Sequence, residues 1–143
     1  MFNIVLVNPE IPHNTGAAGR LALSTGATLH LIDPLGFSID EKAVRRSGLD
    51  YWKDVQLKRW PNWQAFEDSV TDKSRLWLLS TKGTANYWDA EFQKNDYLVF
   101  GRETAGLDDE ILATYPEQLV TIPMPGEGSR SLNLATAVAI VLY

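Results

Sequence analysis

Residues 122–143 read Ile122-Pro-Met-Pro-Gly-Glu-Gly-Ser-Arg-Ser-Leu-Asn-Leu-Ala-Thr-Ala-Val-Ala-Ile-Val-Leu-Tyr143. A loop rich in proline and glycine, which carries Arg130, runs straight into an almost wholly apolar stretch. Ser131 can cap a helix over residues 132–143, and the apolar composition predicts that this helix is buried on every side. Backbone N–H groups at a helix start need partners, so the loop is expected to hold a ligand. The pattern stops abruptly at Tyr143, and we expect the natural helix to continue beyond it.

Short apolar runs, bounded by Gly, Pro, Asn or Asp, predict the strands. The runs are almost continuously hydrophobic rather than alternating, which is typical of strands buried on both faces of a parallel sheet. They are Phe2–Val7, Leu29–Ile32, Leu76–Leu79, Tyr97–Phe100 and Leu119–Ile122.

Helical patterns with recognisable caps lie between these runs. Residues 15–25 follow Asn14 as a possible N-cap and stop at Gly26, and Asn62 can cap residues 63–70. Ser38-Ile-Asp-Glu41 is a capping box before Lys42–Ser47, and Asp108 or Asp109 can cap a short helix to Thr114. The alternation predicts an α/β fold, a mostly parallel sheet flanked by helices, in one domain over residues 1–143.

The composition is that of an ordinary globular protein, with 45% hydrophobic and 22% charged residues. The chain has no cysteine and only two histidines, His13 and His30, so we expect no disulfide, no thiolate nucleophile and no metal site. No apolar run is long enough to span a membrane, and the first residues do not resemble a signal peptide. A cytoplasmic location is the simplest expectation. The net charge of −5 argues against nucleic-acid binding through bulk charge, although a local basic face is compatible with it.

Three further loops at predicted strand ends carry polar residues and glycine. The block Asn8–Arg20 lacks both a dinucleotide fingerprint and a P-loop, so by itself it favours packing, although Arg20 among small residues points towards a ligand or another chain. Leu98–Leu107, with Gly101 at a strand end, is equally compatible with a plain turn and with a ligand loop. Leu79–Gly83 is a similar strand end. Together with the closing loop, these blocks exceed what packing requires.

Basic and aromatic residues offer weaker signals. Lys42, Arg45 and Arg46 form a candidate basic face, but such clusters are most often a solvated helix surface. Aromatic side chains can stack on nucleobases, although most are expected in the core or at interfaces. The aromatic candidates are Tyr51, Trp52, Trp60, Trp63, Trp77, Tyr87 and Trp88.

Taken in order, the blocks resemble the SPOUT superfamily of RNA methyltransferases. Its three motifs correspond to Asn14-Thr-Gly-x-x-x-Arg20, to Phe100-Gly-x-Glu-x-x-Gly-Leu107, and to Ile122-Pro-Met followed by Ser131-Leu-Asn-x-x-x-Ala137. The short length and the stretch Pro9–Gly16 are similar to the branch of minimal tRNA 2′-O-methyltransferases that act on the wobble pyrimidine. The resemblance covers nearly the whole chain. It implies S-adenosylmethionine as cofactor, the anticodon stem-loop of tRNA as substrate, a homodimer, and a deep trefoil knot made by the C-terminal segment.

The resemblance also implies roles for individual residues. Arg20 and Arg130 correspond to catalytic positions, and Arg45, Arg46, Lys82 and Tyr143 to positions that contact RNA. The helices predicted over residues 15–25 and 132–143 would supply much of the dimer interface. The implied cofactor-binding residues are Leu79, Thr81, Gly101, Glu103, Gly106, Ile122, Met124, Ser131, Leu132 and Asn133.

The implied reaction is transfer of the cofactor's methyl group to a ribose 2′-oxygen. Arg20 is a poor base because a guanidinium stays protonated, so we expect it to position the phosphate-ribose unit and to stabilise developing negative charge. A base role assisted by a neighbouring phosphate stays open. Two other functions stay open as well: 2′-O-methylation of another RNA such as rRNA, and a non-catalytic nucleotide-binding module.

Overall fold

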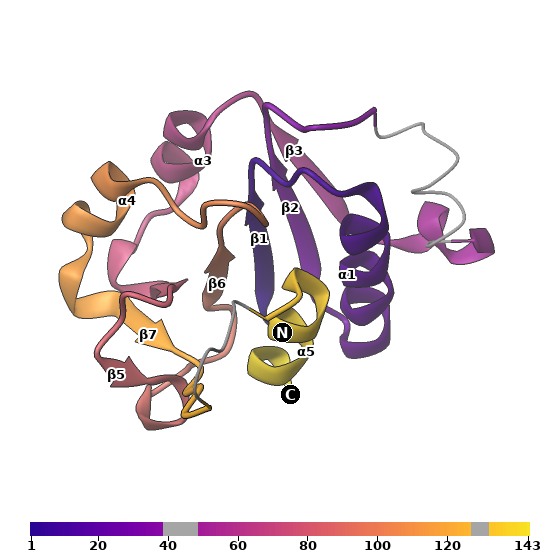
Figure 1. Cartoon of the computed structure of the whole chain (residues 1–143). Helices are drawn as coiled ribbons and strands as arrows, with labels where there is room; N and C mark the ends of the chain where they lie inside the picture. Colours follow the sequence, from indigo (N-terminus) through magenta and orange to yellow (C-terminus); the bar gives the residue numbers. More distant parts are fainter. Residues whose placement is uncertain (39–48, 127–131) are drawn as a thin grey trace.

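The computed structural model describes residues 1–38, 49–126 and 132–143 of the chain (Figure 1). Its centre is a seven-stranded sheet in the order β3-β2-β1-β6-β4-β7-β5, and every neighbouring pair of strands is parallel. The predicted α/β fold with helices flanking a parallel sheet is confirmed. The strands are β1 (Asn3–Val7), β2 (Thr28–Ile32), β3 (Leu57–Trp60), β4 (Leu76–Leu79), β5 (Ala85–Asn86), β6 (Tyr97–Phe100) and β7 (Leu119–Thr121).

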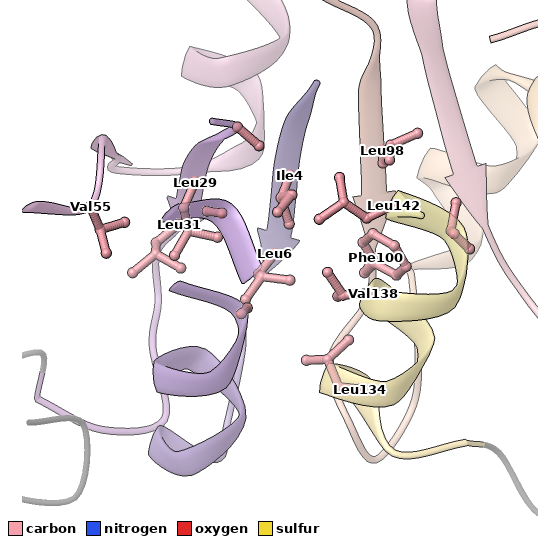
Figure 2. Close-up of a cluster of buried hydrophobic side chains, with 14 residues drawn as sticks. Ile4, Leu6, Leu29, Leu31, Val55, Leu98, Phe100, Leu134, Val138 and Leu142 are labelled. Carbon is pink, nitrogen blue, oxygen red and sulfur yellow. The ribbon is translucent and has the colours of Figure 1, made fainter. Parts of the chain in front are cut away.

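Helices cover both faces of the sheet, and alternate residues of each strand supply the two cores. On one face, Ile4 and Leu6 of β1 pack in one cluster with α1 and α5, where Val138 is completely buried (Figure 2). On the other face, Val5 and Val7 share a second cluster with α3 and α4. The helices are α1 (Pro12–Thr25), α3 (Trp63–Ser69), α4 (Asp109–Thr114) and α5 (Leu134–Leu142).

The ends of α1 show one wrong prediction and one confirmed prediction. The helix begins at Pro12 with Ile11 as N-cap, not at residue 15 with Asn14 as N-cap. Proline is well suited to the first helical position because its missing N–H would have no partner there. At the other end Gly26 is the C-cap, as predicted, and has a left-handed φ of 74°.

The remaining helices also differ in detail from the sequence prediction. Asn62 caps α3, and its side chain accepts a hydrogen bond from Ala65 N, as predicted. Asp108 occupies the N-cap position of α4 without a capping hydrogen bond from its side chain. Ser131 was wrongly predicted to cap the closing helix: α5 begins at Leu134, and the side chain of Asn133 accepts from Thr136 N instead. The predicted helix Lys42–Ser47 lies outside the described residues.

Two strands and the burial of α5 were not predicted correctly. Strand β3 is an edge strand whose residues Leu57, Lys58 and Arg59 are exposed, and β5 has only two residues, so neither has the apolar signature of a buried strand. The closing helix was predicted to be buried on every side. In this chain its buried residues form one face, while Thr136 is exposed.

A buried histidine connects the first three strands of the sheet. His30 is 3% exposed, and its Nδ1 accepts a hydrogen bond of 3.0 Å from the Trp60 indole N–H. The ring is therefore neutral with its proton on Nε2, which donates to Asn3 Oδ1 at 2.9 Å. Burial lowers the pKa of His30 to about 4, and the charge of Lys58 contributes. His30 is thus a core residue.

Candidate cofactor cavity

A cavity of about 340 Å³ opens at the carboxyl ends of β4, β6 and β7. Its walls are the loops that follow these strands, closed on two sides by Leu112 of α4 and by Leu134 and Ala137 of α5. The carboxyl edge of a parallel sheet is where α/β proteins bind their ligands. Most of the residues predicted to bind a cofactor line this cavity: Leu79, Thr81, Gly101, Glu103, Gly106, Ile122, Met124 and Leu132.

Backbone contacts give the loop after β6 its shape. A Cβ atom at Gly101 would collide with the backbone of Gly106 and Leu107, so only glycine fits there. The loop turns back on itself through a hydrogen bond of 2.9 Å from Gly106 N to Arg102 O, and Gly106 has a left-handed φ of 69°. The cavity wall therefore presents backbone atoms directly to whatever the cavity holds.

Glu103 fastens this loop to the start of α1. Its two carboxylate oxygens accept hydrogen bonds of 2.8 Å from Glu10 N and from Ile11 N, and Oε2 also accepts from Asn14 Nδ2 at 3.1 Å. Backbone N–H groups at a helix start have no partners within the helix, and a carboxylate stabilises that positive end. Glu103 lines the cavity, but both of its oxygens are engaged, so we assign it a positioning role rather than direct contact with a ligand.

A second set of hydrogen bonds makes this connection reciprocal. Glu10 Oε1 accepts from the backbone N and the hydroxyl of Thr104, at 3.0 and 2.8 Å. These bonds, with the charge of Arg102, hold the pKa of Glu10 below its usual value. On the far side, Asn133 Nδ2 donates to Asn14 Oδ1 at 3.0 Å. The cavity loop, α1 and α5 are therefore joined through one continuous polar network.

Two ion pairs lie at the rim of the cavity. Lys82 Nζ is 2.9 Å from Asp109 Oδ1, and Arg102 is 3.0 Å from Asp108 Oδ1. The Lys82 hydrogen bond lowers the pKa of Asp109. Both aspartates stand at the beginning of α4, so Lys82 of the loop after β4 and Arg102 of the loop after β6 each face the start of this helix. Lys82, predicted to contact RNA, thus lies on the cavity rim.

The other predicted site residues lie elsewhere. Arg20 is exposed on α1, and Tyr143 is 79% exposed at the end of α5; neither lines the cavity. Asn133 caps α5 and belongs to the polar network rather than to the cavity lining. Arg45, Arg46, Arg130 and Ser131 lie outside the described residues.

Several residues of the site were not predicted from the sequence. Arg102 and Leu107 lie within a quoted motif, and their position there was the available signal. Leu112, by contrast, comes from α4, and the pairing of Glu10 with Thr104 joins residues 94 positions apart. No local pattern reports contacts of that range.

The described residues contain neither a metal-binding cluster nor a membrane-spanning helix. Ranges 1–38, 49–126 and 132–143 hold no cluster of three or more His, Cys, Asp or Glu side chains placed to bind a metal ion. No helix within the same ranges is long and apolar enough to cross a membrane.

The cavity fits a nucleoside cofactor. Its volume lies in the range of small-molecule sites, and it combines apolar walls such as Phe100 and Leu134 with polar backbone groups around Gly101. Backbone N–H and C=O groups can read the edge of an adenine, while the apolar walls can cover its faces.

Comparison with known proteins agrees with this geometry. A tRNA (cytidine(34)-2'-O)-methyltransferase of Yersinia pestis is 49% identical over 148 residues, spanning 100% of this chain and 91% of the relative. A structure solved to explain 2-OH methylation of C/U34 on tRNA matches with a TM-score of 0.95 and 43% identity, over 100% of this chain and 92% of that one.

A more distant structure carries a cofactor. The SpoU methyltransferase AviRb from Streptomyces viridochromogenes, in complex with AdoMet, matches with a TM-score of 0.83 and 29% identity, over 99% of this chain and 55% of that one. The sequence profile of the SpoU rRNA Methylase family matches residues 1–143. The resemblance found in the sequence motifs is therefore confirmed, and the chain belongs to the SpoU rRNA Methylase family.

Proposed function

We propose that this protein is a tRNA 2′-O-methyltransferase that transfers a methyl group from S-adenosylmethionine to the ribose of the wobble nucleotide, position 34. The observation that carries the proposal is the cavity at the carboxyl ends of β4, β6 and β7, whose walls include the loops after β6 and β7, where residues of the second and third family motifs lie. The full-length match to relatives that act on cytidine 34 favours tRNA over rRNA as substrate.

S-adenosylmethionine would be held largely by backbone groups of the loops at Leu79, Gly101 and Ile122, with Met124 and Leu132 as apolar cover. When bound, it supplies an electrophilic methyl group, so no further activation of the donor is needed. The chain's own residues must orient the ribose and assist the departure of the 2′-hydroxyl proton. We assign Thr81 and Ser131 supporting contacts in the same site.

Arg20 is our candidate for orienting the ribose. A guanidinium can hold a phosphate through two parallel hydrogen bonds while its charge stabilises the 2′-oxygen as its proton leaves. Arg130 would approach the same substrate from the loop before α5. We propose that Arg45, Arg46, Lys82 and Tyr143 contact the tRNA, since a chain with net charge −5 needs local cations to hold an anionic substrate.

We also propose a homodimer. Arg20 does not line the cavity of its own chain, and a partner subunit offers a route for α1 to approach a cavity. An exposed apolar side chain on α1 supports this proposal: Leu23 is 41% exposed. Apolar side chains of this kind are common at subunit contacts.

The knot and the location of the protein are further proposals. The C-terminal segment would form the trefoil knot that the SPOUT resemblance implies. The packing of α5 against α1, on the face of the sheet away from α3 and α4, is compatible with such a path. We expect the enzyme to work in the cytoplasm, where its tRNA substrate is.

Nucleoside mass analysis of tRNA tests the function. A strain that lacks this protein should lose a 2′-O-methyl group at the wobble position, and the purified protein with S-adenosylmethionine should restore it. Arg20→Ala should lower methyl transfer about 100-fold, with Arg59→Ala, on the distant edge strand β3, as the matched control. Modification of rRNA alone would contradict the tRNA assignment, and absence of S-adenosylmethionine binding in calorimetry would contradict the methyltransferase assignment.

A further inference from the structure

Trp88 is an unusually exposed aromatic side chain close to the cavity. It lies in the short 3-10 helix η3 (Tyr87–Asp89) that directly follows β5, and it is 60% exposed. Tryptophan carries a large apolar surface, and its side chain is usually highly buried even when it is not buried completely. An indole with this exposed fraction is a candidate for contact with a binding partner.

Strand register puts Trp88 at the cavity edge of the sheet. Asn86, the last residue of β5, pairs with Thr121 of β7, and the two strands run parallel. Thr121 and the next residue, Ile122, line the cavity. The chain therefore leaves β5 at the same edge, and beside the same strand, where the cavity wall begins (Figure 1).

The ring of Tyr87 and a backbone turn support the indole of Trp88. The ring of Tyr87 meets the ring of Trp88 at a centroid distance of 5.6 Å and an angle of 62°, an edge-to-face contact. Tyr87 is itself half-buried and packs against the core on the α1–α5 face. A hydrogen bond of 3.1 Å from Ala90 N to Tyr87 O closes the turn. Because the turn and the tyrosine ring hold the indole, little conformational freedom remains to be lost on binding.

Charged side chains precede β5 and follow Trp88 in the chain. Lys82 lies in the connection between β4 and β5, with 66% of its side chain exposed. Its pairing with the exposed Asp109 is of the kind that contributes little, so a phosphate can replace it. Asp89 and Glu91 follow Trp88 in the chain and are exposed, so they repel phosphate. Of these side chains, only the cation of Lys82 attracts a nucleic-acid backbone.

We propose that Trp88 is a stacking platform for an unpaired nucleobase of the RNA loop that carries the target nucleotide, with Lys82 on the cavity rim holding a phosphate of the same RNA. Loop bases are unstacked and are commonly recognised by stacking on aromatic side chains, which is tolerant of base identity. This inference rests on the proposed function, because it takes an anticodon loop as the substrate. It adds a contact outside the cofactor cavity, on the rim near the sheet edge.

Binding of an anticodon stem-loop RNA by the full chain tests the platform. The RNA carries 2-aminopurine next to the target nucleotide, since stacking on an indole quenches its fluorescence. Trp88→Ala should raise the Kd for this RNA about 5- to 100-fold and relieve the quenching. Trp88→Phe should retain most of both effects. Leu57→Ala, at the opposite edge of the sheet, is the control, and cofactor affinity should be the same in all variants.

The outcomes separate the platform from the proposed function. If the wild-type chain methylates the loop but Trp88→Ala binds and quenches it as well as the wild type, the platform is wrong and the function stands. If the wild type binds the loop without methylating it, the function fails, and the Trp88→Ala comparison still decides the platform. If Trp88→Ala alters the mass of the assembly in solution and leaves RNA affinity unchanged, the indole is a contact between copies of this chain and the platform is wrong.

Discussion

Two polar clusters inside this protein use the same chemistry for different ends. The first joins Asn3, His30 and Trp60 across β1, β2 and β3, and the hydrogen bonds of the histidine ring stay within the sheet. The second joins Glu103, Asn14 and Asn133, and it borders the cavity. The first cluster is neutral and distant from the cavity, whereas the second centres on a carboxylate that fixes a helix start. The first should therefore govern stability alone, and the second should govern stability and cofactor binding together.

Removal of the Glu103 carboxylate should produce the largest effect. Glu103→Ala leaves the N–H groups of Glu10 and Ile11 and the amide of Asn14 without their acceptor. We expect the free energy of unfolding to fall by about 4 kcal/mol, because hydrogen bonds to a charged group are the strong ones. Cofactor affinity should fall as well. Chemical denaturation and calorimetry measure the two effects, with the exposed Glu110→Ala as control; a stable variant would show that the network does not fasten α1.

Lowering the pH should destabilise the folded protein through His30, in the first cluster. His30 has its usual pKa near 6.5 in the unfolded chain and a pKa of about 4 in the folded protein. Between these two values the imidazole is protonated in the unfolded chain but neutral in the folded protein, so protonation favours unfolding. The free energy of unfolding should therefore fall by about 3 kcal/mol between pH 7 and pH 4 from this residue alone. Carboxylates also titrate near pH 4, so the contribution of His30 to the free energy of unfolding is measured as the difference between the wild type and His30→Gln.

A second variant tests the geometry behind this pH dependence. Protonation puts a hydrogen on Nδ1, which then faces the indole N–H of Trp60, and two donors cannot bond to each other. Trp60→Phe keeps an aromatic ring but removes that opposing donor, so the dependence on pH should weaken. Equal pH dependence in the wild type and in both variants would show that the histidine is not the titrating group. Cofactor affinity at pH 7 should be unaffected by His30→Gln.

Gly101 tests the cavity side of the comparison without touching a polar group. Gly101→Ala introduces a Cβ atom into the backbone of Gly106 and Leu107, so the loop must shift. We expect the Kd for S-adenosylmethionine to rise about 30-fold, which corresponds to about 2 kcal/mol. Leu57→Ala, on the edge strand β3 and outside the cavity lining, is the control. Equal affinities of the two variants would show that the loop after β6 does not form the cofactor site.

The comparison also shows where the sequence is informative. The strands of the core, such as Leu76–Leu79 and Tyr97–Phe100, were predicted to the residue because burial on both faces leaves a continuous apolar run. Strand β3 was missed because an edge strand with Lys58 and Arg59 exposed has no such run. Eight of the residues that line the cavity were predicted as cofactor-binding residues through the resemblance to the family. The hydrogen bonds of the polar network were not predicted, because they join residues 89 to 119 positions apart, and Asn14 looked locally like a helix cap.

The smallest effect is expected at the cavity rim. Lys82→Ala removes an ion pair in which both side chains are largely exposed, so Tm should change by less than about 2 °C. RNA affinity should nevertheless fall, because a cation that contributes little to stability can still hold a phosphate, and the dependence of that affinity on salt should become shallower by about one unit of slope. Asp109→Asn leaves Lys82 without its competitor and should strengthen RNA binding slightly. A large loss of stability in Lys82→Ala would instead place the pair with the Glu103 cluster as a structural fastening of α4, and would remove Lys82 from the RNA-binding surface.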